Sequence, residues 1–569
     1  MENRQLRSSA WLILAALIIA GCGGIGKMSK YAENIKYTVD PDPLIVQGDS
    51  VAVSIRGNFP GKYFYKKAQA ELTPTITYAA GETPMEMAGF QGEGAAGNYT
   101  VIPYESGKDF NYNDKVAYTP DMEQSELYVK ILGKQGKKEK EFDPVKLTDG
   151  VITTPYLLQS DDKVLLGKDA FQRITQHSQD LRLQYLVASD QLVNGETRKE
   201  EVKAMQAFLK QNAKNPSVVL KGVVIDGYAS PEGEVQMNEG LALKRHTAAG
   251  RWLKGELNRN KYAMGKSDSM FTMNARGEDW EGFKAAMQAS SLNDKDLVLR
   301  VLEMYPDVNK RESEIKNMAA TYTEIREDIL PQLRRAEMQL NYERIGKTDE
   351  QLIAMSKTMP DSLNVEELLF SATLTNDINE QLRIYKEAER IFPQDYRGAN
   401  NVGYIYMMQN KLGDAETQFN KANGIQNNPV STNNLGVVAR LKGDRKKAME
   451  HYRSATAAGP EVKYNMGIVD IMNGNYSSAN SNMSGVNDFN SALAKLLGGD
   501  AGGAQRALEA SDDKDTAMGH YLMAIIGARQ NNGDMVRNNL GLAVQKDPSL
   551  KDKAMKDLEF GAFKDNLGI

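Results

Sequence analysis

The stretch Gly227-Tyr-Ala-Ser-Pro-Glu-Gly233 decides the fold of the middle of the chain, together with Asn238-Glu-Gly-Leu-Ala-Leu-Lys-Arg245 just after it. Residues 217–226 before it are rich in valine and isoleucine, which predicts a buried central strand. The proline between the two glycines predicts a tight turn. We expect Asn238 to cap the following helix. Such a turn points backbone N–H groups and a helix N-terminus at one spot, with Arg245 about two turns in, which favours an anionic ligand.

The order of strand, glycine-containing loop and helix with its arginine resembles the C-terminal domain of the OmpA/MotB family, whose members bind peptidoglycan. The resemblance implies that a loop aspartate and a helix arginine hold the two ends of a diaminopimelate side group. Arg245 stands at the arginine position, and Ser230 stands at the aspartate position with the family's spacing. The chain therefore keeps one half of the clamp. Loss of a charge-assisted bond of about 1.5–3 kcal/mol weakens the predicted grip roughly ten- to hundredfold.

Four residues are the candidates for peptidoglycan binding, namely Ser230, Glu232, Asn238 and Arg245. Three possibilities are open for them. The domain binds peptidoglycan weakly, or Glu232 substitutes for the missing aspartate, or the fold is kept for contacts with other proteins. The alternative for Arg245 itself is an ordinary solvated arginine on a helix.

The same domain extends on both sides of the loop. Alternating apolar residues at 181–187 predict a strand, and residues 197–211 predict an amphipathic helix. Residues 331–340 contain Arg-Arg-x-Glu and resemble the closing strand of the family. Residues from about 280 to 330 have helical patterns, and the family's domain does not contain this additional helical segment. We therefore expect an α/β OmpA-like domain at 172–345 that carries a helical insertion.

The N-terminus has the pattern of an export signal. Arg4 and Arg7 precede a short apolar run, and small residues lead to the single cysteine. Ile19-Ala-Gly-Cys22 resembles the bacterial lipobox, which implies a signal peptide at 1–21 and a lipid on Cys22. The alternative is a cleaved secretory signal with an incidental cysteine.

The predicted lipid also indicates where in the cell the protein is located. Acyl chains anchor a protein without a membrane-spanning helix, and no later segment has the roughly 20 apolar residues that a spanning helix needs. Gly23 after the cysteine is compatible with sorting to the outer membrane. We expect the chain to face the periplasm behind a short tether at 22–35.

Residues 36–160 carry the pattern of an N-terminal β-sandwich. Short alternating runs, for example at 45–55 and 72–78, are separated by turn glycines and prolines. We expect an Ig-like spacer or partner module there. Its residues indicate no ligand, so one alternative function is placed in this domain, an envelope hydrolase with its catalytic pocket among these strands.

Residues 360–569 are dominated by repetition. A pattern of small and aromatic residues that begins at Asn401 recurs at Asn434 with every offset equal, and again at Asn465 after a slightly shorter interval. It resembles the tetratricopeptide repeat (TPR), which implies a C-terminal α-solenoid of helix hairpins. In TPR proteins this position faces the concave groove, so the three asparagines are peptide-groove candidates that hydrogen-bond an extended backbone. The alternative is that they only satisfy neighbouring helices.

The composition excludes several classes of ligand and catalytic site. The chain has 569 residues, which suits three or four domains, and a net charge of -5, which gives no electrostatic case for nucleic acid. The four histidines lie far apart and there is one cysteine, so we expect no metal site, no cofactor and no Cys/His nucleophile. Carboxylates are common but none has a recognisable catalytic setting.

Together these patterns predict a non-enzymatic outer-membrane lipoprotein. The β domain spaces it from the bilayer, the OmpA-like domain contacts the cell wall, and the repeats bind a protein partner. We expect it to tether an envelope or secretion assembly. The alternative of the same class is a purely protein-binding scaffold without peptidoglycan contact.

Overall fold

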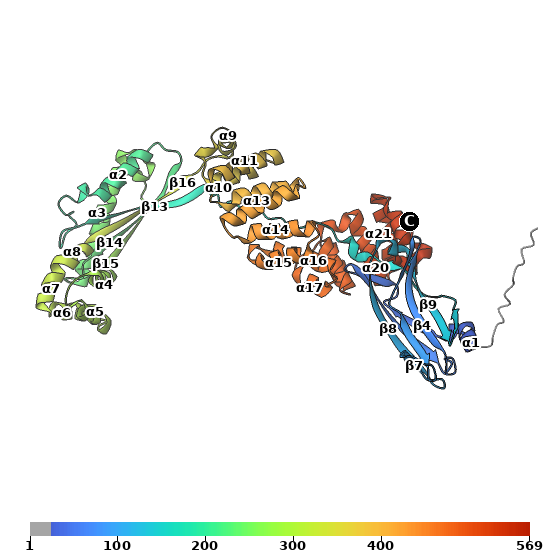
Figure 1. The fold of residues 1–569 in the computed structure, drawn as a ribbon. Coiled ribbons are helices and arrows are strands. Elements are labelled where there is room, and N and C mark those ends of the chain that lie inside the picture. Colours follow the sequence, from blue (N-terminus) through green and yellow to red (C-terminus); the bar gives the residue numbers. More distant parts are fainter. Residues whose placement is uncertain (1–23) are drawn as a thin grey trace, which may run out of the picture. The chain divides into compact units, whose positions relative to one another are not determined.

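A computed structural model describes residues 24–569, so the predicted signal peptide and Cys22 lie outside the described residues. The chain forms two compact units (Figure 1). The first contains the described residues up to Gly167 together with Phe392–Ile569, and the second is Lys168–Ile391. The second unit is therefore inserted into the chain of the first. None of the helices within 24–569 is long and apolar enough to cross a membrane.

The N-terminal part of the first unit is a β-sandwich with a short helix, α1 (Gly24–Lys30), at its start. One sheet contains β1 (Lys36–Asp40), β3 (Ser50–Pro60), β2 (Leu44–Gln47), β12 (Val151–Ile152) and β8 (Gly107–Ala117). The other contains β10 (Lys138–Glu141), β9 (Ser125–Gln135), β4 (Gln69–Tyr78), β6 (Ala88–Gly92), β7 (Thr100–Ile102), β11 (Val145–Asp149) and β5 (Gly81–Pro84). Side chains alternate in burial along β3, and residues of both sheets share one apolar core.

The C-terminal part of the first unit is a solenoid of helix hairpins. The pairs are α12 (Tyr396–Met408) with α13 (Leu412–Ile425), α14 (Pro429–Leu441) with α15 (Arg445–Ser454), α16 (Pro460–Met472) with α17 (Tyr476–Asn482), α18 (Phe489–Leu497) with α19 (Ala501–Glu509), and α20 (Ala517–Arg529) with α21 (Gly533–Lys546). Helix α22 (Leu550–Lys556) follows them. This confirms the TPR-like fold predicted from the repeats.

The repeated small residues explain how each hairpin closes. A Cβ added at Gly403 would lie 2.7 Å from the Phe419 ring, and one at Gly436 would lie 2.5 Å from the Tyr452 ring. The glycine of the first helix therefore accepts the aromatic side chain of the second, as the spacing of the pattern requires.

The second unit is built on a mixed four-stranded sheet. Its strand order is β13 (Ile174–Gln184), β16 (Arg335–Ile345), β14 (Val218–Ala229), β15 (Phe271–Glu278), with β14 and β15 parallel and the other pairs antiparallel. Helix α3 (Val235–Arg259) makes the crossover from β14 to β15, as a parallel pair requires. Helix α2 (Glu200–Asn212) and α3 pack their apolar side chains on the sheet in one core.

Further helices complete this unit. The segment between β15 and β16 forms α4 (Trp280–Ala289), α5 (Lys295–Met304), α6 (Val308–Lys316), α7 (Ala319–Glu324) and α8 (Leu330–Leu333), which have their own apolar core. After β16 come α9 (Asp349–Thr358), α10 (Val365–Thr373) and α11 (Ile378–Ile391). These last three belong to the second unit. We had expected α10 and α11, which lie after residue 360, to belong to the repeat domain at 360–569.

Two local expectations were wrong. Asn238 does not cap α3, because the helix begins one turn earlier at Val235 and Glu234 occupies the cap position. The backbone N–H of Asn238 already donates to the carbonyl of Glu234 within the first turn. The closing strand begins at Arg335 and not at 331, because residues 330–333 continue the preceding helix.

Candidate functional site

The linker between the sandwich and the second unit lies along the solenoid in an extended conformation. We call residues 158–167 the groove segment. Asn465 accepts from the Lys163 N–H at 2.7 Å and donates to the Lys163 carbonyl at 2.9 Å. Asn434 does the same for Leu165 at 2.8 and 2.7 Å. The same side of the solenoid thus holds alternate residues of one strand-like peptide by their backbone.

The ladder has further members at both ends. Asn401 accepts from the Gly167 N–H at 2.7 Å and donates to its carbonyl at 3.0 Å. At the other end Asn490 makes both bonds to Gln159, each at 2.9 Å. The predicted asparagines therefore lie in one groove, and their occupant is a segment of the same chain.

A second row of asparagines supports the first. Asn400 donates to the Leu165 carbonyl at 3.1 Å, and Asn433 donates to the Lys163 carbonyl at 2.9 Å. The two rows also bond to each other, since Asn434 donates to Asn400 at 3.0 Å. All these amides are buried, so the network fixes each side chain in one orientation.

Charge and apolar packing add to the backbone bonds. Asp162 of the groove segment forms an ion pair with Arg440 of α14, and the two side chains are 4% and 7% exposed. Burial raises the pKa of Asp162, while the Arg440 guanidinium acts in the opposite direction. Val164 and Leu165 pack against the apolar core of the solenoid. Removing one partner of such a buried pair costs several kcal/mol, because the remaining charge stays buried without a partner.

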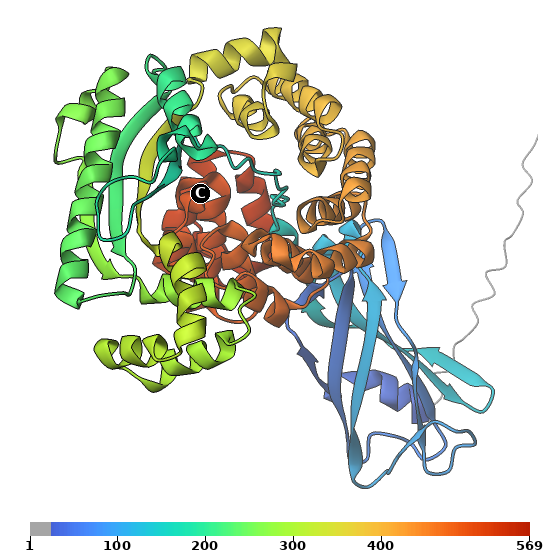
Figure 2. The same cartoon turned by 90° about the vertical axis from the view of Figure 1, so that its left-hand side faces the viewer.

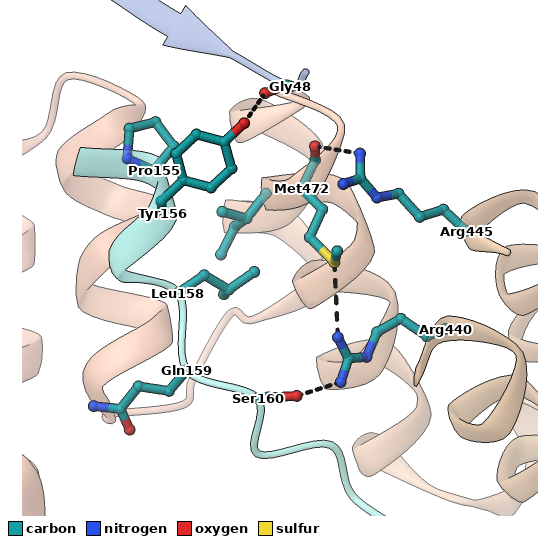
Figure 3. A pocket seen from close by; sticks show the side chains of 10 residues that line it. Gly48, Pro155, Tyr156, Leu158, Gln159, Ser160, Arg440, Arg445 and Met472 are labelled. Carbon is teal, nitrogen blue, oxygen red and sulfur yellow. Dashed lines mark hydrogen bonds between the residues drawn. The ribbon is translucent and has the colours of Figure 1, made fainter. Parts of the chain in front are cut away.

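The sandwich meets the solenoid where the groove segment begins (Figure 3). A small pocket there is lined by the β2–β3 turn, the start of the segment and the solenoid. The Tyr156 hydroxyl donates to the Gly48 carbonyl at 3.5 Å, and Arg445 donates to the Met472 carbonyl at 3.0 Å. Arg445 also pairs with Asp49 at 2.7 Å. Both arginines of this pocket are thus already neutralised, and the junction serves to join the parts of the first unit.

The loop after β14 is the second predicted site. Arg245 lies 1% exposed beneath it. Its Nε donates to Ser189 O at 3.1 Å, and its two Nη atoms donate to Tyr228 O at 2.8 Å and Leu186 O at 3.2 Å. Burial and the neighbouring charge of Arg334 lower the pKa of Arg245 to about 10, so it stays charged at neutral pH. The predicted alternative of a solvated helix arginine is wrong, and Arg245 holds three backbone segments together.

The other candidates gather in the loop itself. The Ser230 hydroxyl donates to Glu232 Oε1 at 2.6 Å, and Arg334 pairs with the same carboxylate at 2.8 Å. The Asn238 amide donates to the Glu232 carbonyl at 3.2 Å and to Glu278 at 2.7 Å. The carboxylate of Glu232 therefore lies beside the serine that occupies the aspartate position of the resemblance.

The helical insertion reaches the same loop. Glu312 of α6 accepts from the Gly233 backbone N–H at 2.7 Å, and Lys316 pairs with this glutamate. We expected backbone N–H groups of this turn to be available to an anionic ligand. The N–H of Gly233 instead donates to a carboxylate of the protein itself. No spacing in the sequence pointed to Glu312, because it lies 79 residues beyond Gly233.

No protein-family model matches the chain. A curated relative, the BBSome complex member BBS4 of Bos taurus, is 25% identical over 119 residues, which are 20% of this chain. The chain spans 23% of the length of that protein.

Similar solved structures are repeat proteins. A tetratricopeptide repeat protein from Parabacteroides merdae is 16% identical, with 37% of this chain and 91% of that one covered and a TM-score of 0.28. PilF of Pseudomonas aeruginosa is 14% identical, with 38% and 99% covered and a TM-score of 0.29. YrrB, described as a TPR protein with an unusual peptide-binding site, is 17% identical, with 36% and 100% covered and a TM-score of 0.22. These likenesses concern the repeat fold alone.

Proposed function

We propose that the protein is a non-enzymatic scaffold of the bacterial envelope, lipid-anchored through Cys22 at the periplasmic face of the outer membrane, whose repeats bind a protein partner. The observation that carries the proposal is the asparagine ladder. The ladder binds a segment of the same chain by its backbone and so joins the sandwich to the solenoid. The linkage gives one stiff unit on which an assembly can be held.

The partner surface lies outside the groove in this proposal. The groove segment is covalently attached at both ends, so its effective concentration is on the order of millimolar and a free peptide competes poorly with it. The solenoid offers an apolar rim instead. Met408 ends α12 and is 60% exposed, and Leu441 ends α14 at the equivalent position of the next repeat and is 40% exposed. Exposed apolar side chains repeated along one edge favour protein contact.

Site-specific crosslinking tests this function. A photoreactive amino acid at position 408 or 441 of the chain, expressed in its own cells, is expected to capture the same protein from both positions. The control position is Lys551, which is exposed on α22. Met408→Asp with Leu441→Asp should lower recovery of that protein at least about tenfold with unchanged thermal unfolding, since anchors of an interface contribute about 1–2 kcal/mol each. A chain that forms no adduct from either rim position contradicts the proposal.

A second candidate function is peptidoglycan contact by the second unit, which would tether the assembly to the cell wall. The carboxylate of Glu232 beside Ser230 favours it, because an ammonium group could pair with that carboxylate in place of Arg334. Such a bond is charge-assisted and contributes about 1.5–3 kcal/mol.

Sedimentation with purified sacculi tests the wall contact. Glu232→Gln keeps the size of the side chain and removes its charge, so we expect sacculus binding to fall about tenfold or more. Glu234→Gln is the matched control, since Glu234 is exposed two positions away. Binding that is absent in the wild type, or equal in wild type and Glu232→Gln, rejects this function and leaves the purely protein-binding scaffold.

A further inference from the structure

One end of the β-sandwich carries a group of lysine and tyrosine side chains. We call it the basic-aromatic end and define it by Lys27, Lys30, Lys62, Lys66, Tyr31, Tyr65 and Tyr104. A shallow hollow brings together Lys27 of α1 and Tyr31 just after this helix with Lys62 and Tyr65 of the loop after β3. Lys66 lies over the Tyr104 ring at 5.8 Å, and Lys30 lies over the Tyr31 ring at 5.4 Å. Three separate segments thus contribute to one surface.

Helix α1 is fixed to this end by packing. Ile25 and Met28 are buried in the sandwich core, and the Tyr63 hydroxyl donates to the Met28 carbonyl at 2.8 Å. A Cβ at Gly24 would lie 2.6 Å from the Tyr65 ring, so the chain passes close to this tyrosine. Gly24, which is two positions after Cys22 in the sequence, therefore lies at the basic-aromatic end.

The lysines of this end differ from other lysines of the same domain. On β9, Lys130 pairs with Glu82 at 2.5 Å and Lys134 pairs with Glu71 at 2.7 Å. Within residues 24–569, by contrast, Lys27, Lys30, Lys62 and Lys66 have no carboxylate within ion-pair distance, and all four are exposed. Four exposed lysines without an ion pair leave positive charge at this end of the sandwich with which an external anion can pair.

The β-sandwich extends away from the solenoid (Figure 2). Strand β3 starts at Ser50, beside the turn whose Gln47 donates to Gly474 of the solenoid at 3.0 Å, and ends at Pro60, which lines the hollow. Its 11 residues span about 35 Å at the rise of a β-strand. One end of the sandwich thus holds the solenoid, and the other is free for a different surface.

We infer that the basic-aromatic end is a docking face for the anionic headgroups of a phospholipid membrane, an inference that rests on the lipid anchor of the proposed function. Lysine ammonium groups pair with headgroup phosphates, and tyrosine rings prefer the interface between headgroups and acyl chains. The contact holds the sandwich upright on the bilayer. The solenoid then stands about the length of β3 above the headgroups, where the anchor alone would leave the chain free to tilt.

Vesicle sedimentation of the unacylated chain tests this face. The chain from residue 22 with Cys22→Ser is mixed with vesicles of phosphatidylglycerol and phosphatidylethanolamine, or with neutral phosphatidylcholine vesicles. We expect binding to the anionic vesicles only, with weaker binding at high salt. Lys27→Glu with Lys62→Glu should weaken it at least about tenfold, since each lysine near an anionic surface contributes roughly a fivefold factor.

A matched variant and a separate assay keep the outcomes distinct. Lys115→Glu with Lys551→Glu makes the same change of net charge at exposed positions away from the basic-aromatic end and should bind as the wild type does. Equal loss in both variants, or no binding to anionic vesicles, overturns the docking face. Incorporation of labelled palmitate at Cys22 in cells tests the lipid anchor independently. The docking face and the lipid anchor can therefore be rejected separately.

Discussion

Replacing Asn401, Asn434 and Asn465 together by alanine is expected to lower the free energy of unfolding of the first unit by about 4–6 kcal/mol, at about 1 kcal/mol net for each hydrogen bond lost. The three side chains make six such bonds to the backbone of Lys163, Leu165 and Gly167. Chemical denaturation followed by far-ultraviolet circular dichroism measures the change, because the solenoid is helical.

Proteolysis gives the same prediction a second readout. Release of the groove segment should expose the bond after Lys163 to trypsin, and a new fragment should appear under native conditions. The control replaces three exposed solenoid asparagines, Asn420, Asn427 and Asn538, by alanine and is expected to unfold as the wild type does. If the ladder variant unfolds at the wild-type denaturant concentration and is not cut, the asparagines do not hold the segment.

Arg245→Ala should destabilise the second unit by about 3–5 kcal/mol, the range for truncating a large buried side chain that has polar partners. The substitution removes a side chain that is 1% exposed and leaves three backbone carbonyls, of Leu186, Ser189 and Tyr228, without their donor. The tryptophans within the described residues, Trp252 and Trp280, both lie in this unit, so their fluorescence during denaturation follows its unfolding directly.

The same helix supplies the control for Arg245. Arg251 is exposed on α3, and Arg251→Ala is expected to stay within about 0.5 kcal/mol of the wild type. A fluorescence transition of Arg245→Ala that coincides with the wild type would show that the buried guanidinium does not stabilise the fold. Because a loss of folding would also abolish any ligand binding, Glu232→Gln is the better probe of wall contact.

The elements of the second unit were largely predictable, because each has a strong local pattern. The valine-rich run before Gly227 became β14, and the insertion after residue 280 became helices with a core of their own. The start of α3 was misplaced because Asn238 is a good capping residue, while the chain had already turned at Gly233, where φ is 98°. Local propensity does not specify which turn the chain uses.

The groove was predictable in part. The regular spacing pointed to Asn401, Asn434 and Asn465, but Asn490 follows Asn465 at a shorter interval and broke the repeat. Asn400 and Asn433 were visible as the first members of Asn-Asn pairs. The occupant could not be predicted, since the ladder binds backbone groups that every residue possesses, and residues 158–167 carry no side-chain signature of it.

Hydrogen–deuterium exchange of the amides of Lys163, Leu165 and Gly167 tests the central claim most directly. In this structure each N–H donates to a buried asparagine, so we predict protection that is lost only when the solenoid opens. Exchange at these three amides as fast as in an exposed loop would mean that the linker is free and the groove is empty.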